Sequence, residues 1–224
     1  MARVRKDGEE TRRRILRAAF QVFGEKGYRD ATHAEICRRA GVNTAAINYH
    51  FGSKDGLYQA TWDHAAERAT QLYPVDGGVA PGAPAAERLL GLVRAHLQRR
   101  ADVKRLGHFH RIRMMELVNP TGLLDEAIGA WRQKSRAHFL EVIRELLGPD
   151  ATQAELEMCE MSVFSQCILA YKGRLPHSWA FKADAVDALA EHIVRFSLSG
   201  MRAVRDDIQA RKQPLLQKTA GGLR

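Results

Sequence analysis

The 224-residue sequence has few cysteines, few aromatic residues and no long apolar run. Its three cysteines are an odd number without the spacing of metal ligands, which argues against a disulfide framework and indicates reduced thiols. No apolar stretch approaches the ~20 residues of a membrane-spanning helix. The first residues, MARVRKDGEE, lack the apolar core of a signal peptide. These absences predict a cytoplasmic protein without a membrane partner.

Aromatic residues make up only 7% of the chain, whereas the strong helix formers Ala, Leu, Arg and Glu are abundant. This composition predicts an all-α fold, and the length suffices for one small and one larger domain. Lys and Arg outnumber Asp and Glu by 35 to 26, a formal charge of +9, which suits a polyanionic partner. We find no internal repeat.

The segment 31–57, ATHAEICRRAGVNTAAINYHFGSKDGL, has the pattern of two short helices joined by a tight turn and followed by the start of a third. Thr32 opens a T-x-x-E capping box at the first helix start. Gly41 stands where a helix needs a left-handed terminating residue, and Asn43 or Thr44 can cap the second helix. The outer face of this second helix is small and polar. A helix–turn–helix of this kind places its second helix in the DNA major groove.

An amphipathic helix is predicted over Glu9–Lys26, and its apolar stripe must pack on the two short helices because they bury too little surface alone. The basic tail before it, Met1–Asp7, is expected either to be disordered or to act as an arm that reaches DNA phosphates or the minor groove. We therefore expect a three-helix DNA-binding head over residues 1–53. A larger helical effector-binding and dimerisation domain follows over 54–210, and a disordered tail over 211–224.

At these positions the sequence closely resembles the TetR family of transcriptional regulators. The resemblance covers roughly the first quarter of the chain and rests on many residues that agree in order and spacing. They are Thr32, Ile36, Ala40-Gly41-Val42, Ile47, Tyr49-His50-Phe51, Ser53-Lys54 and Leu57. Asn48 is a departure, because many members carry a tyrosine there. The resemblance implies a dimeric regulator that uses Tyr49 and Lys54 as phosphate contacts.

The chemistry of base recognition assigns roles within the second helix. Thr44 and Ala45 are small enough to approach base edges, where a methyl group can contact the thymine methyl. Asn48 can donate and accept at once, which matches N6 and N7 of adenine. Lys54, in the first turn of the next helix, lies beside free backbone amides that suit a phosphate. The complete predicted DNA-binding set is Thr32, His33, Asn43, Thr44, Ala45, Asn48, Tyr49, His50 and Lys54.

The other members of this set have less specific roles. Thr32 and His33, at the start of the first short helix, could hold a second phosphate. Tyr49 and His50 could bond phosphates or pack in the turn, and a packed core histidine is an equal alternative for His50.

Downstream of the head, a stretch rich in proline and glycine at 73–84 interrupts the helical pattern and predicts a loop. A second capping box begins at Thr152. The segment RMMELVNPTGLLDE, residues 113–126, resembles the C-terminal domain of a CerR or CecR type branch of the TetR family. Apolar periodicity predicts helices over Ser53–Leu72, Ala85–Arg100, Leu106–Val118, Thr121–Leu147, Thr152–Tyr171 and Asp184–Val204.

Methionine and aromatic residues in this body are adaptable walls for a small molecule, although they are also ordinary core residues. His108 and His110 lie on different faces of a helix, so a shared metal ion is not expected. We expect no metal and no cofactor. The predicted effector pocket is Phe109, His110, Arg113, Met114, Trp131, Phe164, Cys167 and Tyr171.

The last two long helices are apolar over more than one narrow stripe, which is more than a single neighbour requires. Such a pair of helices from each of two chains forms a four-helix bundle, and the family resemblance implies the same dimer. The predicted dimer interface is Leu156, Val163, Val186, Leu189, Ile193 and Phe196.

These features together predict a homodimeric repressor that binds a near-palindromic double-stranded DNA operator and is released by a small-molecule effector. An alternative is a DNA-associated scaffold with a protein partner and no effector, which would bind random and cognate duplexes equally. An enzyme is not expected, because the sequence has no nucleophile–base pair at a recognised spacing, no phosphate loop and no set of metal ligands.

Overall fold

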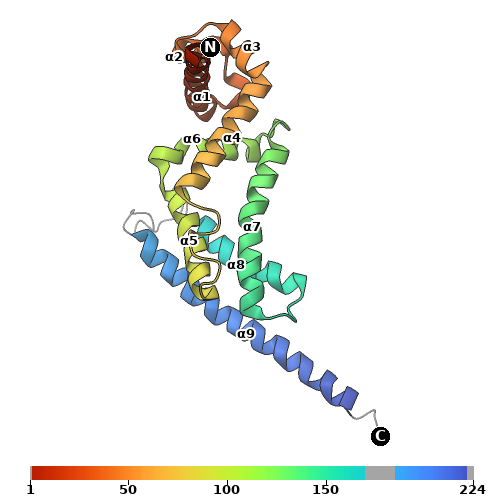
Figure 1. Cartoon of the computed structure of the whole chain (residues 1–224). Coiled ribbons are helices and arrows are strands. Elements are labelled where there is room, and N and C mark those ends of the chain that lie inside the picture. Colours follow the sequence, from red (N-terminus) through yellow and green to blue (C-terminus); the bar gives the residue numbers. More distant parts are fainter. Residues whose placement is uncertain (1, 170–184, 221–224) are drawn as a thin grey trace. The chain divides into compact units, whose positions relative to one another are not determined.

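The computed structural model describes the backbone of residues 2–169 and 185–220 and the side chains of residues 7–167 and 185–211. Within these residues every regular element is a helix, so the predicted all-α fold is confirmed (Figure 1). None of these helices is both long and apolar enough to cross a membrane. The helices are α1 (Ala2–Asp30), α2 (His33–Ala40), α3 (Thr44–Phe51), α4 (Lys54–Leu72), α5 (Ala85–Ala101), α6 (Val103–Val118), α7 (Asp125–Leu147), α8 (Gln153–Leu169) and α9 (Val186–Ala220).

Both ends of the described chain are more helical than the sequence predicted. The first helix begins at Ala2, so most of the basic tail is its first two turns instead of a disordered segment. The last helix continues to Ala220, through most of the expected disordered tail over 211–224. A helix that is already formed gains about one hydrogen bond for each residue that it adds, which favours extension over an irregular end.

The chain folds into two compact units, residues 1–72 with 102–133 and residues 73–101 with 134–224. The first unit holds α1 to α4, α6 and the start of α7, and the second holds α5, the rest of α7, α8 and α9. Neither unit coincides with the predicted head or body, because α6 packs against α1 and α4. The predicted boundary after residue 53 divides the chain by function and stays a prediction.

The first unit is organised around α1, which packs on α2, α4 and α6. No surface is exposed at four residues of its apolar stripe, Ile15, Ala19, Val22 and Phe23. Burial of each large side chain contributes about 1.5–3 kcal/mol. The helix bends at Gly27, whose φ of 78° lies in the left-handed region that glycine adopts easily. After the bend, one more helical turn ends at Asp30, and Ala31 and Thr32 connect it to α2. The position of the bend therefore determines where the helix–turn–helix begins.

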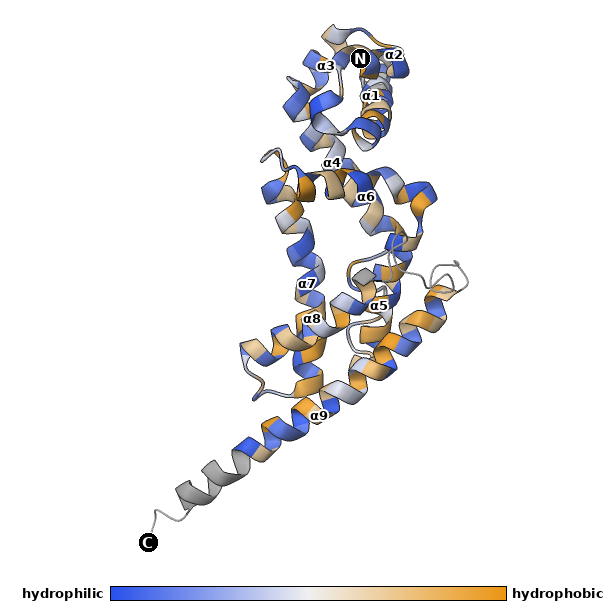
Figure 2. Cartoon of the chain, turned by 180° about the vertical axis from the view of Figure 1, so that it is seen from behind, coloured by the Kyte–Doolittle hydropathy of each residue, from blue (hydrophilic) through white to orange (hydrophobic). Residues whose placement is uncertain are grey.

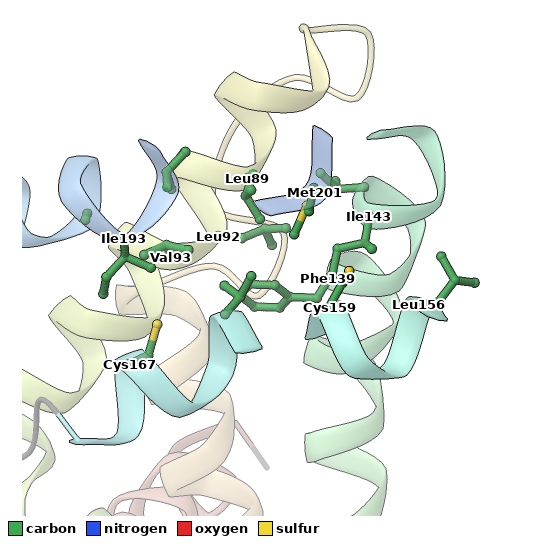
Figure 3. Packing of buried hydrophobic residues seen from close by; sticks show 14 of the residues in the cluster. Leu89, Leu92, Val93, Phe139, Ile143, Leu156, Cys159, Cys167, Ile193 and Met201 are labelled. Carbon is green, nitrogen blue, oxygen red and sulfur yellow. The ribbon is translucent and has the colours of Figure 1, made fainter. Parts of the chain in front are cut away.

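The second unit has one apolar core, enclosed by α5, α8, α9 and the C-terminal part of α7. Figure 3 shows Leu89 and Leu92 of α5, Phe139 and Ile143 of α7 and Met201 of α9 meeting in this interior. Apolar residues are frequent in the first part of α9 (Figure 2), in line with its packing on α5 and α8.

The turn before α8 also joins that helix to α9. The Thr152 amide donates to the Glu155 carboxylate at 2.8 Å, and the Glu155 amide donates to Thr152 Oγ1 at 3.3 Å, so the second capping box is complete. Arg211 of α9 donates to Glu155 at 2.9 Å. This hydrogen bond, followed by those from Thr152, lowers the pKa of Glu155 to about 2.

Candidate nucleic-acid interface

The turn between α2 and α3 is built by backbone and capping contacts. Gly41 ends α2 in the left-handed conformation, with φ 63° and ψ 43°, and its amide donates to the Cys37 carbonyl. The Val42 amide donates to the same carbonyl at 3.1 Å. Asn43 then caps α3, because its side-chain oxygen accepts from the Ala46 amide at 3.0 Å. The predicted helix–turn–helix is confirmed.

Arg14 of α1 braces this turn, a role that the sequence did not reveal. Its guanidinium donates to the Ala40 carbonyl at 2.6 Å and to the Gly41 carbonyl at 2.9 Å. A cation at the C-terminus of a helix satisfies free carbonyls and opposes the negative end of the helix dipole. The only signal in the sequence is a cluster of arginines over 12–17, in which nothing distinguishes Arg14 from its neighbours.

Ion pairs hold the start of α2 against the end of α1. Thr32 caps α2 and accepts from the Glu35 amide at 3.2 Å. The Glu35 carboxylate, expected to bond back to Thr32, instead pairs with Lys26 at 2.5 Å and with Arg39 at 2.9 Å. Arg39 also pairs with Glu25 at 2.7 Å. The hydrogen bond from Lys26 is the main cause that lowers the pKa of Glu35, and the bond from Arg39 lowers that of Glu25.

The predicted base-reading face of α3 is open. Ile47 is the buried residue of this helix, whereas Thr44, Ala45 and Asn48 are exposed. Tyr49 is 84% exposed, more than any other large apolar side chain in the described part of the chain. The helix therefore presents small and polar groups, with one projecting phenol, to any partner that approaches it.

The two predicted histidine contacts are less accessible. His33 is half-buried in the first turn of α2, and its Nε2 atom has no hydrogen-bond partner among the described residues. His50 is half-buried at the end of α3, edge-on to Tyr49 with ring centroids 4.9 Å apart. Both interpretations of His50 therefore stay open.

Lys54, in the first turn of α4, is positioned by the last turn of α1. Its ammonium lies 4.5 Å from the centre of the Tyr28 ring and 3.4 Å from the Arg29 carbonyl. The Tyr28 hydroxyl donates to Asp55 at 2.5 Å, and this bond is the main cause that raises the pKa of Tyr28. The sequence predicted Lys54 as a contact but gave no signal for the residues that hold it.

Three predicted effector-pocket residues of the first unit, Phe109, Arg113 and Trp131, lie in one aromatic cluster. Phe109 has no exposed surface and stacks on Trp62 with ring centroids 5.0 Å apart. Trp131 meets Phe109 edge-on at 5.4 Å, and the Arg113 guanidinium lies 5.9 Å from the centre of the Trp131 ring. Phe109 is therefore a core residue, which was the alternative interpretation of the pattern, whereas Trp131 and Arg113 are half-buried.

The rest of the described set is divided between the two units. His110 is buried beside Phe109, whereas Met114 is 43% exposed. Phe164 and Cys167 belong to the second unit, where burial raises the pKa of the Cys167 thiol to about 12. Tyr171 lies outside the described residues. No single unit brings the predicted pocket together, so the set stays a prediction.

The predicted dimer interface needs correction. Four of its six residues are at most 7% exposed and belong to the core of the second unit, so their own chain covers them. Leu189 is half-buried and Phe196 is 66% exposed. The apolar excess of α8 and α9 serves packing among α5, α7, α8 and α9. The four buried residues are Leu156, Val163, Val186 and Ile193.

A capped helix–turn–helix with an open second helix, followed by a helical body, defines the class of helix–turn–helix transcriptional regulators. Residues 15–61 match the family model of bacterial regulatory proteins of the tetR family. Residues 85–201 match the model of the C-terminal domain of HTH-type transcriptional dual regulator CecR. The chain belongs to the TetR family, whose members are transcriptional regulators and not enzymes, and its C-terminal domain is of the CecR type.

Individual relatives agree with this assignment. HTH-type transcriptional regulator SrpR of Pseudomonas putida is 29% identical over 150 residues, which are 67% of this chain and 65% of SrpR. HTH-type transcriptional dual regulator CecR of Shigella flexneri is 49% identical over 53 residues, 24% of this chain and 23% of CecR. The chain thus spans less than two thirds of the length of either relative.

The fold is also shared with solved structures. A TetR-like transcriptional regulator from Rhodococcus sp. RHA1 superposes with a TM-score of 0.60 at 19% identity. The superposition covers 85% of this chain and 96% of that protein, which shows a common helical architecture.

Proposed function

We propose that this chain is a repressor that binds a near-palindromic DNA operator as a homodimer and is released by a small-molecule effector. The observation that carries the proposal is the open outer face of α3. The Gly41 turn and the Asn43 cap fix the backbone of this face, and Arg14 braces the turn. A rigid helix with small exposed side chains is what close approach to base edges requires.

The roles within the interface follow from the chemistry of each side chain. Thr44 and Ala45 would contact thymine methyl groups, and Asn48 would read adenine with its amide. Tyr49 and Lys54 would bind phosphates and so fix the register of the helix. Two such helices, held about 34 Å apart by a two-fold axis, would read the two halves of the operator.

A second copy of the chain would meet exposed apolar side chains of α8 and α9. Met158 and Met161 of α8 are 55% and 64% exposed, and Phe196 of α9 is 66% exposed. A large aromatic group with flexible methionines is the composition expected at the centre of a protein interface. Gly200 has open space where a side chain would stand, which permits close approach of a second helix. These residues replace the four buried ones in the proposed interface.

The effector would act through the distance between the two heads. Entry of a molecule into the helical body shifts packed helices as rigid bodies, and a shift of the heads spoils their match to successive major grooves. Helix α4 is the natural connection, since it follows α3 directly and packs on α1 and α6.

Selection of bound duplexes from a random pool tests the proposal. The full chain should enrich one near-palindromic motif and bind it roughly 10³-fold more tightly than random DNA. The double variant Asn48→Ala, Tyr49→Ala should lose this enrichment. Gln133→Ala, which removes an exposed amide on α7, serves as the matched control. Equal affinity for random and enriched duplexes, with the same salt dependence, would favour the scaffold instead.

A further inference from the structure

The first unit contains a cavity of about 610 Å³ between the end of α1 and α6. Its walls come from Lys26–Asp30, from Tyr58 of α4, and from the second half of α6 with the turn that follows it. This volume falls within the ~300–1,000 Å³ of small-molecule sites. The cavity shares only Met114 with the predicted effector pocket, so it is a different place in the fold.

Part of the lining is apolar and accessible. Met114 is 43% exposed and Val118 is 78% exposed, although both are large apolar side chains. A side chain at Gly27 would stand 3.1 Å from the sulfur of Met115, so the glycine lets the bend of α1 come close to this thioether. Methionines adapt to ligands of different shape, which suits a wall that contacts an aliphatic group.

Two arginines give the cavity a positive edge. Arg29 and Arg111 both line it and are both exposed. Arg29 donates to the Pro120 carbonyl at 3.4 Å, and neither arginine forms an ion pair with a residue in the described part of the chain. Lys26 lines the cavity as well but pairs with Glu35. Arginine binds a carboxylate through two parallel hydrogen bonds, so these two side chains suit an organic anion.

The buried carboxylate of the lining already has its hydrogen bonds. Glu116 is 6% exposed and accepts from the Tyr58 hydroxyl at 2.8 Å and from the Thr121 amide and hydroxyl at 3.0 Å each. Burial, with the bond to Glu116 second, raises the pKa of Tyr58, which keeps its hydroxyl protonated as a donor. Asp30 is the other carboxylate, and the lining therefore has three cations against two acids.

We propose that this cavity binds a small organic anion with an apolar body, of the class of medium-chain carboxylates. The carboxylate lies between Arg29 and Arg111, and the aliphatic body lies against Met114, Met115 and Val118. The inference rests on the proposed function, since it assigns a second effector site to the DNA-binding regulator.

Tyr28 connects this site to a predicted DNA contact. Its ring lines the cavity and lies beneath the Lys54 ammonium, and Lys54 also meets the Arg29 carbonyl. A ligand that draws Arg29 toward the cavity or displaces Tyr28 therefore moves Lys54 from its position. Asp30 of the cavity wall also lies three residues before the start of α2 at His33. Occupancy lowers the affinity for DNA because it disturbs both connections.

Methionine methyl signals report the site directly. Met114 and Met115 line the cavity, whereas Met158, Met161 and Met201 lie in the second unit. The full chain, labelled with ¹³C at its methionine methyl groups, is titrated with octanoate. Uncharged 1-octanol and cationic octyltrimethylammonium serve as probes of the same chain length. Octanoate shifts the Met114 and Met115 signals at lower concentration than either of the other probes.

Variants test the charge requirement. Arg111→Gln weakens octanoate binding about tenfold, since it removes a charge-assisted pair of hydrogen bonds. Arg132→Gln changes an exposed arginine of α7 outside the cavity and leaves octanoate binding as in the unmodified chain. In the same samples octanoate weakens binding of the selected operator, and Arg111→Gln requires about ten times more octanoate for the same effect.

The outcomes separate this inference from the proposed function. Octanoate shifts confined to Met158, Met161 and Met201, or tighter binding of octyltrimethylammonium at Met114 and Met115, would overturn the anion site. If the chain selected and bound an operator but octanoate did not move the Met114 and Met115 signals, the anion site would be excluded and the repressor function would stand. Shifted Met114 and Met115 signals in a chain that selects no DNA motif would remove the repressor function and leave the anion site.

Discussion

The ammonium of Lys54 lies 4.5 Å from the centre of the Tyr28 ring, which joins the first turn of α4 to the last turn of α1. A cation–π contact at an exposed site contributes about 0.5–1 kcal/mol. The contact also restricts a long side chain before DNA arrives, and this restriction lowers the entropy lost when the ammonium binds a phosphate. The predicted phosphate contact is therefore prepared by a residue far from it in sequence.

Replacing Tyr28 by leucine should weaken DNA binding about two- to fivefold, because the ring beneath Lys54 is lost. The factor should be the same for the selected operator and for random duplex, since a phosphate contact carries no sequence information. Tyr28→Phe keeps the ring, so its affinity for both duplexes should stay close to that of the unmodified chain. Fluorescence anisotropy at fixed salt measures both affinities. A loss confined to the operator would show that Tyr28 affects base reading instead.

Lys54→Ala should weaken binding to every duplex alike and reduce the slope of log affinity against log salt by about one unit. One fewer cation then neutralises DNA phosphate. Titrations of operator and random duplex over a range of salt concentrations measure the slope, and Lys104→Ala, an exposed lysine of α6, is the control.

Asn48→Ala should relax the preference at one base pair in each half-site, at a cost of about 1–3 kcal/mol on the preferred sequence. The salt slope should not change, because the amide is uncharged. Repeating the selection with this variant shows which position loses its preference. If Asn48→Ala and Lys54→Ala behaved identically on all sequences, the division between base-reading and phosphate-binding residues would be wrong.

The parts of the interface that the sequence predicted are those with local causes. Gly41 at a left-handed position and Asn43 as a cap act within four residues of their partners, so their pattern is visible in the chain. Arg14 acts on carbonyls 26 and 27 residues away, and only the fold shows which arginine does so. The same applies to Tyr28, which lies beneath a lysine of another helix.

Four of the predicted interface residues were misplaced for a different physical reason, whereas the homodimer itself stays a prediction. Apolar periodicity shows that Leu156 and Val163 are covered, but it does not show whether their own chain or a second chain covers them. In the structure they lie in the core of the second unit. Exposed apolar side chains such as Phe196 are the better guide, because the described chain leaves them in water.

Acid should destabilise the second unit through Glu155. Its pKa in the folded chain is about 2, below the ordinary value of 4.5. A depressed carboxyl pKa contributes stability that is fully present above pH 4.5 and is lost as the pH falls toward 2. Urea unfolding midpoints at pH 7 and pH 3 should therefore differ less in Glu155→Gln than in the unmodified chain. Glu191→Gln, an exposed glutamate of α9, should keep the full difference.

Phe196→Glu should convert the proposed homodimer into a monomer. A stable interface buries about 1,600 Å² in total and depends on a few aromatic and methionine anchors near its centre. A carboxylate placed there would lose its hydration without a partner, which costs several kcal/mol and raises the dimer dissociation constant at least 10²-fold. Sedimentation velocity at micromolar concentration measures the change.

Leu117→Glu provides the matched control, because Leu117 of α6 is 73% exposed and lies outside the proposed interface. The Phe196→Glu monomer should bind a single half-site weakly and lose the preference for the full palindrome, since two-fold symmetry no longer places two copies of α3 on one duplex. A Phe196→Glu chain that remained dimeric would exclude this face of α9. A Leu117→Glu chain that became monomeric would place the interface on α6, where Leu117 and Val118 are the most exposed apolar residues at 73% and 78%.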